Sequence, residues 1–536
     1  MKSNPGVIVF GLDGGTWDLL GPLMSDGIMP NLARIAKEGV TGDLRSTLPS
    51  YTPTAWSSFA TGKNPGKHGV FGFTTIRENS QTRMWVSSKS IKTATLWKIL
   101  SDHGLRVGLL NVPLTYPPEE VNGFVVSGFP APENASEVTY PHELLSRMEA
   151  NIGTYILNSN LDNSFWTGDK TKEEAFMGIE RMRQMTLKRG KALFWLMDEY
   201  PTDLFMAVFV ASDRIQHQFW KWLDPSCSYY HLPGAAEYRE KISEVYGIID
   251  RILGQVCDRM SGDQTLYVVS DHGFGPREKV FYTNKWLADL GLLRFKTGKR
   301  FLRAVCGKLG LWDSLPLTKL FPALAEMKQD PCIDWEKTVA RGGRVDESGI
   351  YLNSTEGATG DQARAIVDRL LALKDPETGK PMVIDVLRRE DVFSGPFVQQ
   401  APHLLVRWRR GYYGLDSDSI HFTNWLRHVP APKGDHLDNG VLAAYGRGIS
   451  LNRVVEGASI MDMAPTILHL LGLPVPDDMD GKVLTEIYDA DFVAGNPVRY
   501  SSPSDVVQQA REDEDVYSDE DSAEIHDRLR ALGYVD

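Results

Sequence analysis

Three aspartates follow apolar, strand-like runs, and their positions suggest a shared site. Asp13, Asp213 and Asp271 each come just after such a run. Because the carboxyl ends of parallel strands lie along one edge of a sheet, we expect the three side chains to meet there. A single such aspartate is most often a helix cap or turn residue, but converging carboxylates repel one another unless cations lie between them. The pattern therefore predicts a cation site.

Histidines accompany two of these aspartates. His217 lies four residues after Asp213, which places both on one face of a helical turn, and His272 directly follows Asp271. Mixed aspartate and histidine ligation is typical of zinc or manganese, because magnesium and calcium prefer oxygen ligands. These residue types do not distinguish a zinc site from a manganese site.

The tetrapeptide Ser-Asp-His-Gly occurs twice and provides an internal control. Residues 270–273 follow a strand-like run, whereas residues 101–104 follow a helix-like run. At a helix end, Gly104 is an ordinary C-terminal cap. We therefore assign the ligands to the second copy and interpret His103 as structural.

Thr52 is the candidate nucleophile. It fits the N-cap of a helix, with Pro53 at the first helical position and Gly62 beyond the end. These residues alone favour a capped helix with no further role. The N–H groups and the positive dipole end of a helix nevertheless stabilise phosphate oxygens, so a metal-activated Thr52 hydroxyl is a candidate to attack phosphorus.

The elements that must position these residues alternate between apolar strands and helix-like stretches. This alternation predicts an α/β fold with a mostly parallel central sheet and helices on both faces. Helical periodicity predicts packed helices at about 169–199 and 460–471. The predicted strands are Val7–Leu12, Arg106–Val112, Leu204–Ala211 and Thr265–Ser270.

Changes in composition divide the chain into four expected parts. These are a metal-binding core at 1–280, an inserted α+β lobe at 281–429, a return to the core at 430–500, and an acidic linker with a C-terminal helix at 501–536. The lobe is expected to close over the metals and select the substrate. Its basic, apolar segment from Arg294 to Lys308 is at least as typical of a solvated helix as of a contact with an anionic substrate. The linker is expected at Arg511–Glu524 and the helix at about Ile525–Leu532.

Composition and charge exclude several classes of protein. The formal net charge is −12 and the pI about 5.6, so no global field attracts nucleic acid or an anionic membrane. No signal peptide or membrane-spanning run is evident, and four scattered cysteines suit reduced thiols. These features predict a cytoplasmic protein that acts on a small molecule.

Five short motifs stand in order along the chain. They are Asp13-Gly14, Thr52 with Thr61-Gly62 and His68-Gly69, Asp213 with His217, Ser270-Asp271-His272-Gly273, and Gly434-Asp435-His436. In this order they resemble the motifs of the type I phosphodiesterase/nucleotide pyrophosphatase family, which belongs to the alkaline phosphatase superfamily. The resemblance spans about Val7 to Leu473 and implies an alkaline phosphatase-like fold.

The resemblance also implies the ligand sets and the mechanism. One divalent metal ion would be held by Asp13, Thr52, Asp271 and His272, and a second by Asp213, His217 and His436. The ions would be zinc, with manganese as the alternative. Thr52 would attack a phosphate ester in line and form a phosphothreonine intermediate that water then hydrolyses.

One departure from the family affects the expected substrate. Nucleotide pyrophosphatases often carry an asparagine shortly after the His-Gly, where it donates to a phosphate oxygen, and Phe73 stands there in this chain. We therefore expect a phosphodiesterase, with a phosphomonoesterase, a phosphomutase and a catalytically silent binding protein as alternatives. A sulfatase is set aside because no cysteine lies near Thr52. A nucleotide, a lipid and a glycan headgroup all remain open as the esterified group.

Overall fold

The computed structural model describes residues 6–76, 83–132, 135, 137–158, 170–296, 333–343, 349–353, 360–415, 424–502 and 516–532. The chain divides into two compact units, each with its own core. Unit 1 comprises Met1–Arg277, Phe393–Ala401 and Pro430–Asp536, and unit 2 comprises Glu278–Val392 and Pro402–Val429. Within the described residues, no helix combines the length and apolar character needed to cross a bilayer.

Unit 1 is built on a nine-stranded, mostly parallel sheet in the order β18-β2-β17-β9-β1-β8-β5-β6-β7. The four predicted strands are confirmed as β1, β5, β8 and β9. Antiparallel β17, between β2 and β9, was not predicted. The strand bounds are β1 Val7–Leu12, β2 Val40–Arg45, β5 Val107–Leu110, β6 Gly123–Val126, β7 Thr139–Tyr140, β8 Leu204–Phe209, β9 Thr265–Val269, β17 Asn439–Gly446 and β18 Arg453–Ser459.

The register of the central strands explains why the aspartates meet. Val7 of β1 pairs with Leu204 of β8 and with Thr265 of β9, all in parallel. The three strands therefore end at the same edge of the sheet. Their residues are buried throughout, as expected for strands covered on both faces.

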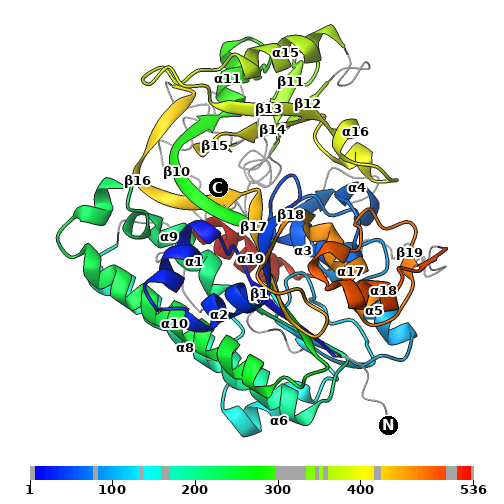
Figure 1. Ribbon diagram of the computed structural model, residues 1–536. Coiled ribbons are helices and arrows are strands. Elements are labelled where there is room, and N and C mark those ends of the chain that lie inside the picture. The colour runs from blue at the N-terminus through cyan, green and yellow to red at the C-terminus, as the bar shows by residue number, and fades with distance from the viewer. Residues whose placement is uncertain are drawn as a thin grey trace. The chain divides into compact units, whose positions relative to one another are not determined.

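Helices cover both faces of this sheet. Figure 1 shows α1, α2, α8 and α10 on one side and α3, α5 and α17 on the other. The predicted helix at 169–199 is α8, which begins where Thr171 and Glu174 form a reciprocal capping box. The bounds are α1 Trp17–Ser25, α2 Pro30–Glu38, α3 Thr52–Thr61, α5 Leu96–Asp102, α8 Lys172–Glu199, α9 Ala211–Leu223, α10 Ala235–Arg259 and α17 Met463–Leu470.

The C-terminal helix is longer than predicted. Helix α19 spans Asp519–Leu532 and thus includes six residues assigned to the acidic linker. The Ser518 hydroxyl accepts a hydrogen bond from the Asp521 amide, and the Asp521 carboxylate accepts one from the Ser518 amide. Acidic residues in a first turn also stabilise the positive end of the helix dipole. The acidic composition that suggested a linker therefore marks a helix start.

Unit 2 contains a four-stranded sheet in the order β11-β12-β14-β13, with its own apolar core. Strand β12, Ile350–Leu352, pairs with β11 and β14. The basic segment from Arg294 to Lys308 lies outside the described residues after position 296. Other bounds are β11 Ala340–Gly342, β13 Val383–Arg388, β14 Leu404–Trp408, β15 Gly411–Leu415, α11 Thr283–Asp289 and α15 Asp361–Leu371.

The division differs from the expected single insertion at one short segment. Phe393–Ala401 belongs to unit 1, because the Phe397 amide donates to the Gly66 carbonyl at 2.9 Å and the Asn64 side chain donates to Ser394 at 3.1 Å. Strands β10 (Gly273–Tyr282) and β16 (Leu426–Leu437) belong to a three-stranded sheet in the order β15-β10-β16.

Candidate active site

The three aspartates lie at one edge of the unit 1 sheet. Asp13 follows the last residue of β1, Asp271 comes two residues after β9, and Asp213 is in the first turn of α9 after β8. All three are nearly inaccessible to solvent, at 1%, 0% and 4% exposure. The Gly14 amide donates to Asp271 Oδ1 at 3.1 Å and so links two of the strand ends.

Asp13, Asp271 and His272 form the first group of candidate ligands. His272 Nε2 lies 3.3 Å from Asp271 Oδ2 and 3.8 Å from Asp13 Oδ1. Thr52 Oγ1 lies 3.3 Å from the same nitrogen. The proposed nucleophile therefore stands beside this group.

Asp213, His217 and His436 form the second group. Asp213 Oδ1 lies 3.3 Å from His217 Nε2 and 3.4 Å from His436 Nε2, and the two nitrogens are 3.1 Å apart. The expected helical spacing of Asp213 and His217 is confirmed by α9. His436 comes from β16, more than two hundred residues later in the chain.

Backbone carbonyls fix the tautomers of the three histidines. The Nδ1 atoms of His217, His272 and His436 lie 3.2, 3.1 and 2.8 Å from the carbonyl oxygens of Gly434, Gly273 and Ser50, respectively. A carbonyl oxygen only accepts, so each Nδ1 carries the proton and each neutral ring offers an Nε2 lone pair. The lone pairs of His217 and His436 therefore face each other, an arrangement that is repulsive without a cation or an added proton between them.

The spacing of these atoms fits a tetrahedral ion. Two ligand atoms bound at zinc distances are about 3.3 Å apart at the tetrahedral angle, and the separations within both groups are close to this value. Asp13 Oδ1 and Asp271 Oδ2 are buried and have no hydrogen-bond partner among the described residues. Buried carboxylate oxygens of this kind are expected to bind a metal. The residues present therefore fit two divalent ions.

Electrostatics support the same interpretation. Burial, followed by the charge of Asp213, raises the pKa of Asp13 to about 8. Burial and the charge of Asp13 likewise raise the pKa of Asp271 well above its ordinary value. For His436, burial lowers the pKa but the hydrogen bond and charge of Asp213 outweigh it, so the pKa is raised. The protein by itself thus concentrates more negative charge here than it neutralises.

Thr52 is the first residue of α3, and the predicted N-cap is wrong by one position. Tyr51 is the N-cap, Pro53 lies in the first turn, and Gly62 ends the helix in the left-handed conformation, with φ of +65°. The Tyr51 side chain makes no capping hydrogen bond. The Thr52 hydroxyl lies beside His272 at a helix end that favours anions.

Two side chains that the sequence did not single out hold the first group in place. Trp56 Nε1 donates to Asp13 Oδ2 at 3.2 Å, which leaves Asp13 Oδ1 toward His272. Gln216 Nε2 donates to the Gly14 carbonyl at 2.8 Å. Gly14 itself has φ of +67°, and an added Cβ would lie 2.7 Å from the Phe274 ring. These contacts join residues far apart in the chain, so no local pattern reveals them.

His103, from the first copy of the repeated tetrapeptide, and His68 lie outside both groups. His103 caps the end of α5, and its Nδ1 donates to the Ile99 carbonyl at 2.8 Å, as the internal control predicted. His68 is fully buried, with Nδ1 accepting from the Val70 amide and Nε2 donating to Ser58 Oγ at 2.9 Å. Burial and the nearby Lys63 charge lower the pKa of His68 to about 3, so this ring is neutral and structural.

Phe73 is part of an aromatic row beside the second group. Its ring centroid is 6.3 Å from that of Tyr51 and 6.1 Å from that of Phe129, and the Tyr51 centroid is 6.4 Å from that of His436. Phe73 is only 2% exposed. The position where the family often has an asparagine is thus apolar and packed.

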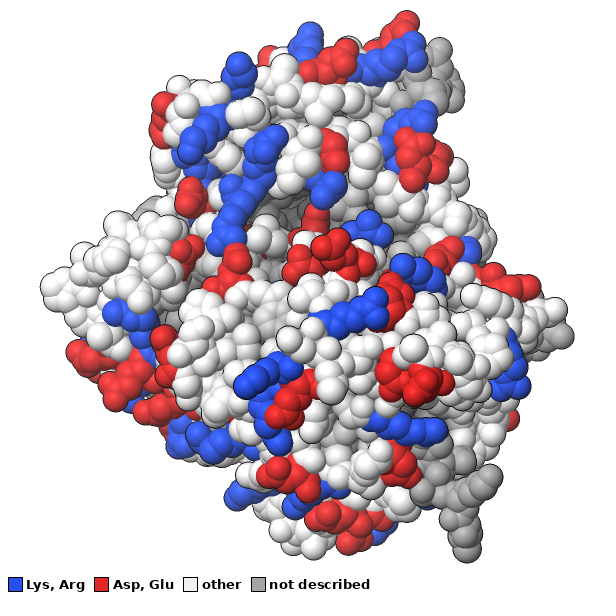
Figure 2. Space-filling model, viewed as in Figure 1, with Lys and Arg blue, Asp and Glu red and all other residues white. Residues whose placement is uncertain are grey.

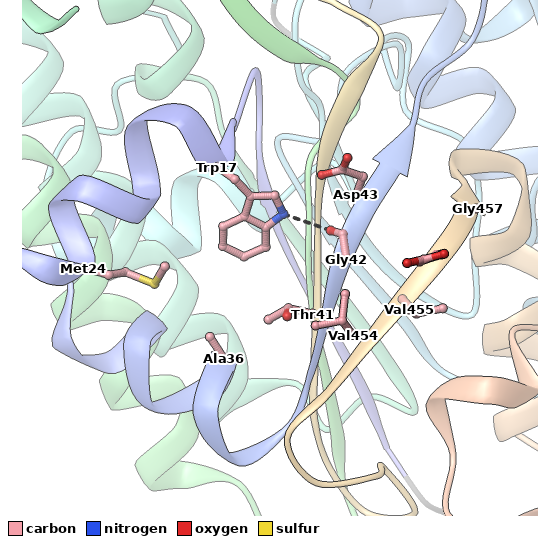
Figure 3. Close-up of a pocket in the computed structure, with 10 residues that line it drawn as sticks. Trp17, Met24, Ala36, Thr41, Gly42, Asp43, Val454, Val455 and Gly457 are labelled. Atoms are coloured by element: carbon pink, nitrogen blue, oxygen red, sulfur yellow. Dashed lines mark hydrogen bonds between the residues drawn. The ribbon is translucent and has the colours of Figure 1, made fainter. Parts of the chain in front are cut away.

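A pocket of about 560 Å³ in unit 1 shares no residue with either ligand group. It lies between α1, α2 and the strands β2 and β18, where the indole N–H of Trp17 donates to the Gly42 carbonyl at 2.9 Å (Figure 3). On the face of unit 1 seen in Figure 2, acidic and basic side chains are largely interspersed. The charge that bears on phosphate chemistry is therefore the local charge of the two groups.

Comparisons with solved structures agree with this architecture. Phosphonoacetate hydrolase from Sinorhizobium meliloti 1021, in complex with phosphonoformate, aligns with a TM-score of 0.54 and 18% identity over 87% of this chain and 95% of that chain. Murine ectonucleotide pyrophosphatase/phosphodiesterase 5, in complex with AMP, aligns with a TM-score of 0.51 and 13% identity over 90% of this chain and 100% of that chain. At these identities the likeness shows the fold, which is alkaline phosphatase-like.

Curated relatives match over short stretches. The 2,3-bisphosphoglycerate-independent phosphoglycerate mutase of Laribacter hongkongensis is 45% identical over 56 residues, which are 10% of this chain and 11% of that protein. The corresponding mutase of Prochlorococcus marinus is 41% identical over 69 residues, 12% of each. The chain thus matches about a tenth of the length of these relatives.

The family comparison covers most of the chain. The type I phosphodiesterase / nucleotide pyrophosphatase family matches residues 7–430, a range that includes every candidate site residue except His436. The chain therefore belongs to the type I phosphodiesterase/nucleotide pyrophosphatase family.

Proposed function

We propose that this protein is a metal-dependent hydrolase of small phosphate esters, with a preference for phosphodiesters and Thr52 as its nucleophile. One observation carries the proposal: the Thr52 hydroxyl stands 3.3 Å from His272 Nε2, beside two Asp/His groups whose atoms are spaced as metal ligands. The alternative of a silent binding protein would be expected to have lost ligands, and here all of them converge.

Asp13, Asp271 and His272, with Thr52, would hold one ion, and Asp213, His217 and His436 the other. The donor set suits zinc or manganese. Divalent ions bound there would lower the pKa of the Thr52 hydroxyl and of a water molecule and would neutralise phosphate charge.

The protein's own residues then position the reaction. Thr52 Oγ1 would bond to phosphorus as the bond from phosphorus to the leaving alcohol breaks, and the leaving oxygen departs in line. The first turn of α3 presents backbone N–H groups to the phosphate oxygens. For a diester, this phosphothreonine still carries the second organic group. Water would then attack its phosphorus, break the bond to Thr52 Oγ1, release a phosphate monoester and restore the Thr52 hydroxyl.

A phosphomutase is the second candidate, because the local identity to phosphoglycerate mutases reaches 45%. A mutase passes the phosphoryl group to a second alcohol, whereas a hydrolase passes it to water. Incorporation of ¹⁸O from labelled water into the released phosphate product distinguishes the two.

The proposal is tested with bis(p-nitrophenyl) phosphate and p-nitrophenyl phosphate, using protein stripped of metal and then reconstituted with zinc or manganese. Hydrolysis that requires the added ion is expected. Equal turnover by the metal-free protein would refute the metal-dependent mechanism. Two bound ions without any turnover would favour the silent binding protein.

A further inference from the structure

Strand β10 supplies a second layer of contacts around the candidate ligands. It begins directly after His272, and its Phe274 ring packs against the rings of His217 and His436, with centroids 4.8 and 5.3 Å apart. A Cβ at Gly273 would lie 2.0 Å from the Asn439 carbonyl oxygen, so the chain segments after His272 and His436 approach closely here. The position of His436 thus depends on how β16 lies against β10.

An ion pair joins these two strands one residue before His436. Arg277 Nη1 of β10 donates to Asp435 Oδ2 of β16 at 3.0 Å. The other oxygen, Asp435 Oδ1, accepts the backbone N–H of His436 at 2.8 Å. Both side chains are largely buried, at 14% and 12% exposure. Each oxygen of this carboxylate therefore has a defined partner.

The same ligand is also tied to the nucleophile segment. His436 Nδ1 donates to the Ser50 carbonyl at 2.8 Å, and Ser50 lies two residues before Thr52. A displacement of His436 would alter the second ligand group and the support of Thr52 together. The contacts from Arg277 through Asp435 and His436 to Ser50 form one continuous series.

We infer that Arg277 is a positioning residue that sets His436, through Asp435, at the distance and orientation the second ligand group requires. The inference rests on the proposed function, because it assigns His436 to a metal ion. The alternative is an ordinary cross-strand ion pair that contributes only to stability.

The chain offers a matched control for that alternative. Arg407 and Asp385 are directly opposed on β14 and β13, with Nη1 and Oδ2 2.8 Å apart and about a third of each side chain exposed. This pair belongs to unit 2 and contains no candidate ligand. Arg407→Met therefore reports what the loss of a cross-strand pair does by itself.

The test compares Arg277→Met, Arg277→Lys and Arg407→Met in the full chain. Zinc affinity is measured in competition with a chromophoric chelator, kcat and KM with bis(p-nitrophenyl) phosphate, and stability by thermal melting. Arg277→Met is expected to weaken one of two bound ions about tenfold or more and to lower kcat more than it raises KM. Arg277→Lys should recover part of both effects. Arg407→Met should change only the melting temperature.

Asp435→Asn provides a second variant if Arg277→Met does not fold. It keeps an oxygen for the His436 amide but removes the charge that faces Arg277, so a smaller loss of zinc affinity is expected. Zinc affinity and kcat in Arg277→Met equal to those in Arg407→Met would overturn the inference. A wild type that holds two ions but hydrolyses no ester would refute the proposed function alone, and one that binds no second ion would overturn both.

Discussion

The imidazole rings of His272 and His436 lie face to face, with centroids 3.5 Å apart and planes inclined by 21°. His272 belongs to the first ligand group and His436 to the second, so the groups meet at this stacked pair. The residues that would hold the two ions are therefore in direct contact, and the positive charge supplied there would act on a single phosphate group.

Replacing Thr52 should remove turnover without unfolding the protein. Because Tyr51 and not Thr52 is the N-cap of α3, Thr52→Ala is expected to cost less than about 1 kcal/mol of stability and to lower kcat on the order of 10³-fold or more. Thr54→Ala, on the same turn and equally buried, is the control and should keep near-normal turnover. Wild type that is acid-quenched during turnover of bis(p-nitrophenyl) phosphate should yield a peptide whose Thr52 carries a nitrophenyl phosphate group, detected by mass spectrometry. Near-normal turnover by Thr52→Ala would require another nucleophile.

The number of metal ions bound per chain should depend on each ligand group separately. The wild type is expected to hold two ions per chain after dialysis, and His217→Ala about one, because the first group remains complete. His103→Ala should retain both ions, since that ring bonds to the end of α5. Elemental analysis gives the counts, and an unchanged count in His217→Ala would remove His217 from the site.

Sequence periodicity predicted the central elements, because strands buried on both faces and a long capped helix leave strong local patterns. The ends of the predicted strands then identified three aspartates as candidates: Asp13 after β1, Asp213 at the start of α9 and Asp271 after β9. The four-residue spacing from Asp213 identified His217. These inferences used only local sequence and the geometry of a parallel sheet. They did not require contacts between distant segments.

The remaining features depend on such contacts. His436 lies in a polar stretch of β16, and its ring packs against His217, His272 and Phe274 from distant parts of the chain, so the residues alone did not identify it. Trp56 and Gln216 act on Asp13 and Gly14 from separate helices. The start of α19 was missed because the acidic residues that favour a helix N-terminus also resemble a solvated linker.

Asp13 should make the metal-free protein less stable as the pH rises. The pKa of Asp13 is raised to about 8 in the folded state, chiefly by burial, so protonation of Asp13 favours folding. The stability it contributes is present below the unfolded pKa of about 4 and is lost as the pH rises toward about 8. Asp13→Asn should therefore raise the free energy of unfolding of the metal-free protein at about pH 8 by at least about 1 kcal/mol.

Asp250→Asn is the matched control for that experiment. Asp250 is as buried as Asp13, but its carboxylate accepts hydrogen bonds from the backbone amides of Asn31 and Leu32. Its replacement should lower stability at both about pH 5 and about pH 8. Denaturant titrations of chelator-treated protein provide the values. A lower free energy of unfolding for Asp13→Asn than for the wild type at about pH 8 would contradict the inferred excess of negative charge at the site.

The packed ring of Phe73 should favour diesters over monoesters. A monoester dianion has a third free oxygen that needs a donor, whereas a diester carries one charge and places an organic group there. Phe73 is 2% exposed and lies against Tyr51 and Phe129, so this position is apolar and offers no hydrogen-bond donor. Contact with the second organic group could then contribute to stabilising the transition state. The wild type is therefore expected to show the higher kcat/KM for the diester.

Two substitutions separate the apolar character of Phe73 from its size. Phe73→Leu removes the ring but adds no donor and should keep the diester preference. Phe73→Asn adds an amide and should narrow that preference about tenfold, the effect of roughly one hydrogen bond to a charged oxygen. Both should lower stability by a few kcal/mol, since large core side chains are costly to truncate. The deciding measurement is kcat/KM for matched nitrophenyl monoesters and diesters at one pH and one metal loading. A large advantage for the monoester in the wild type would place this protein among the phosphomonoesterases instead.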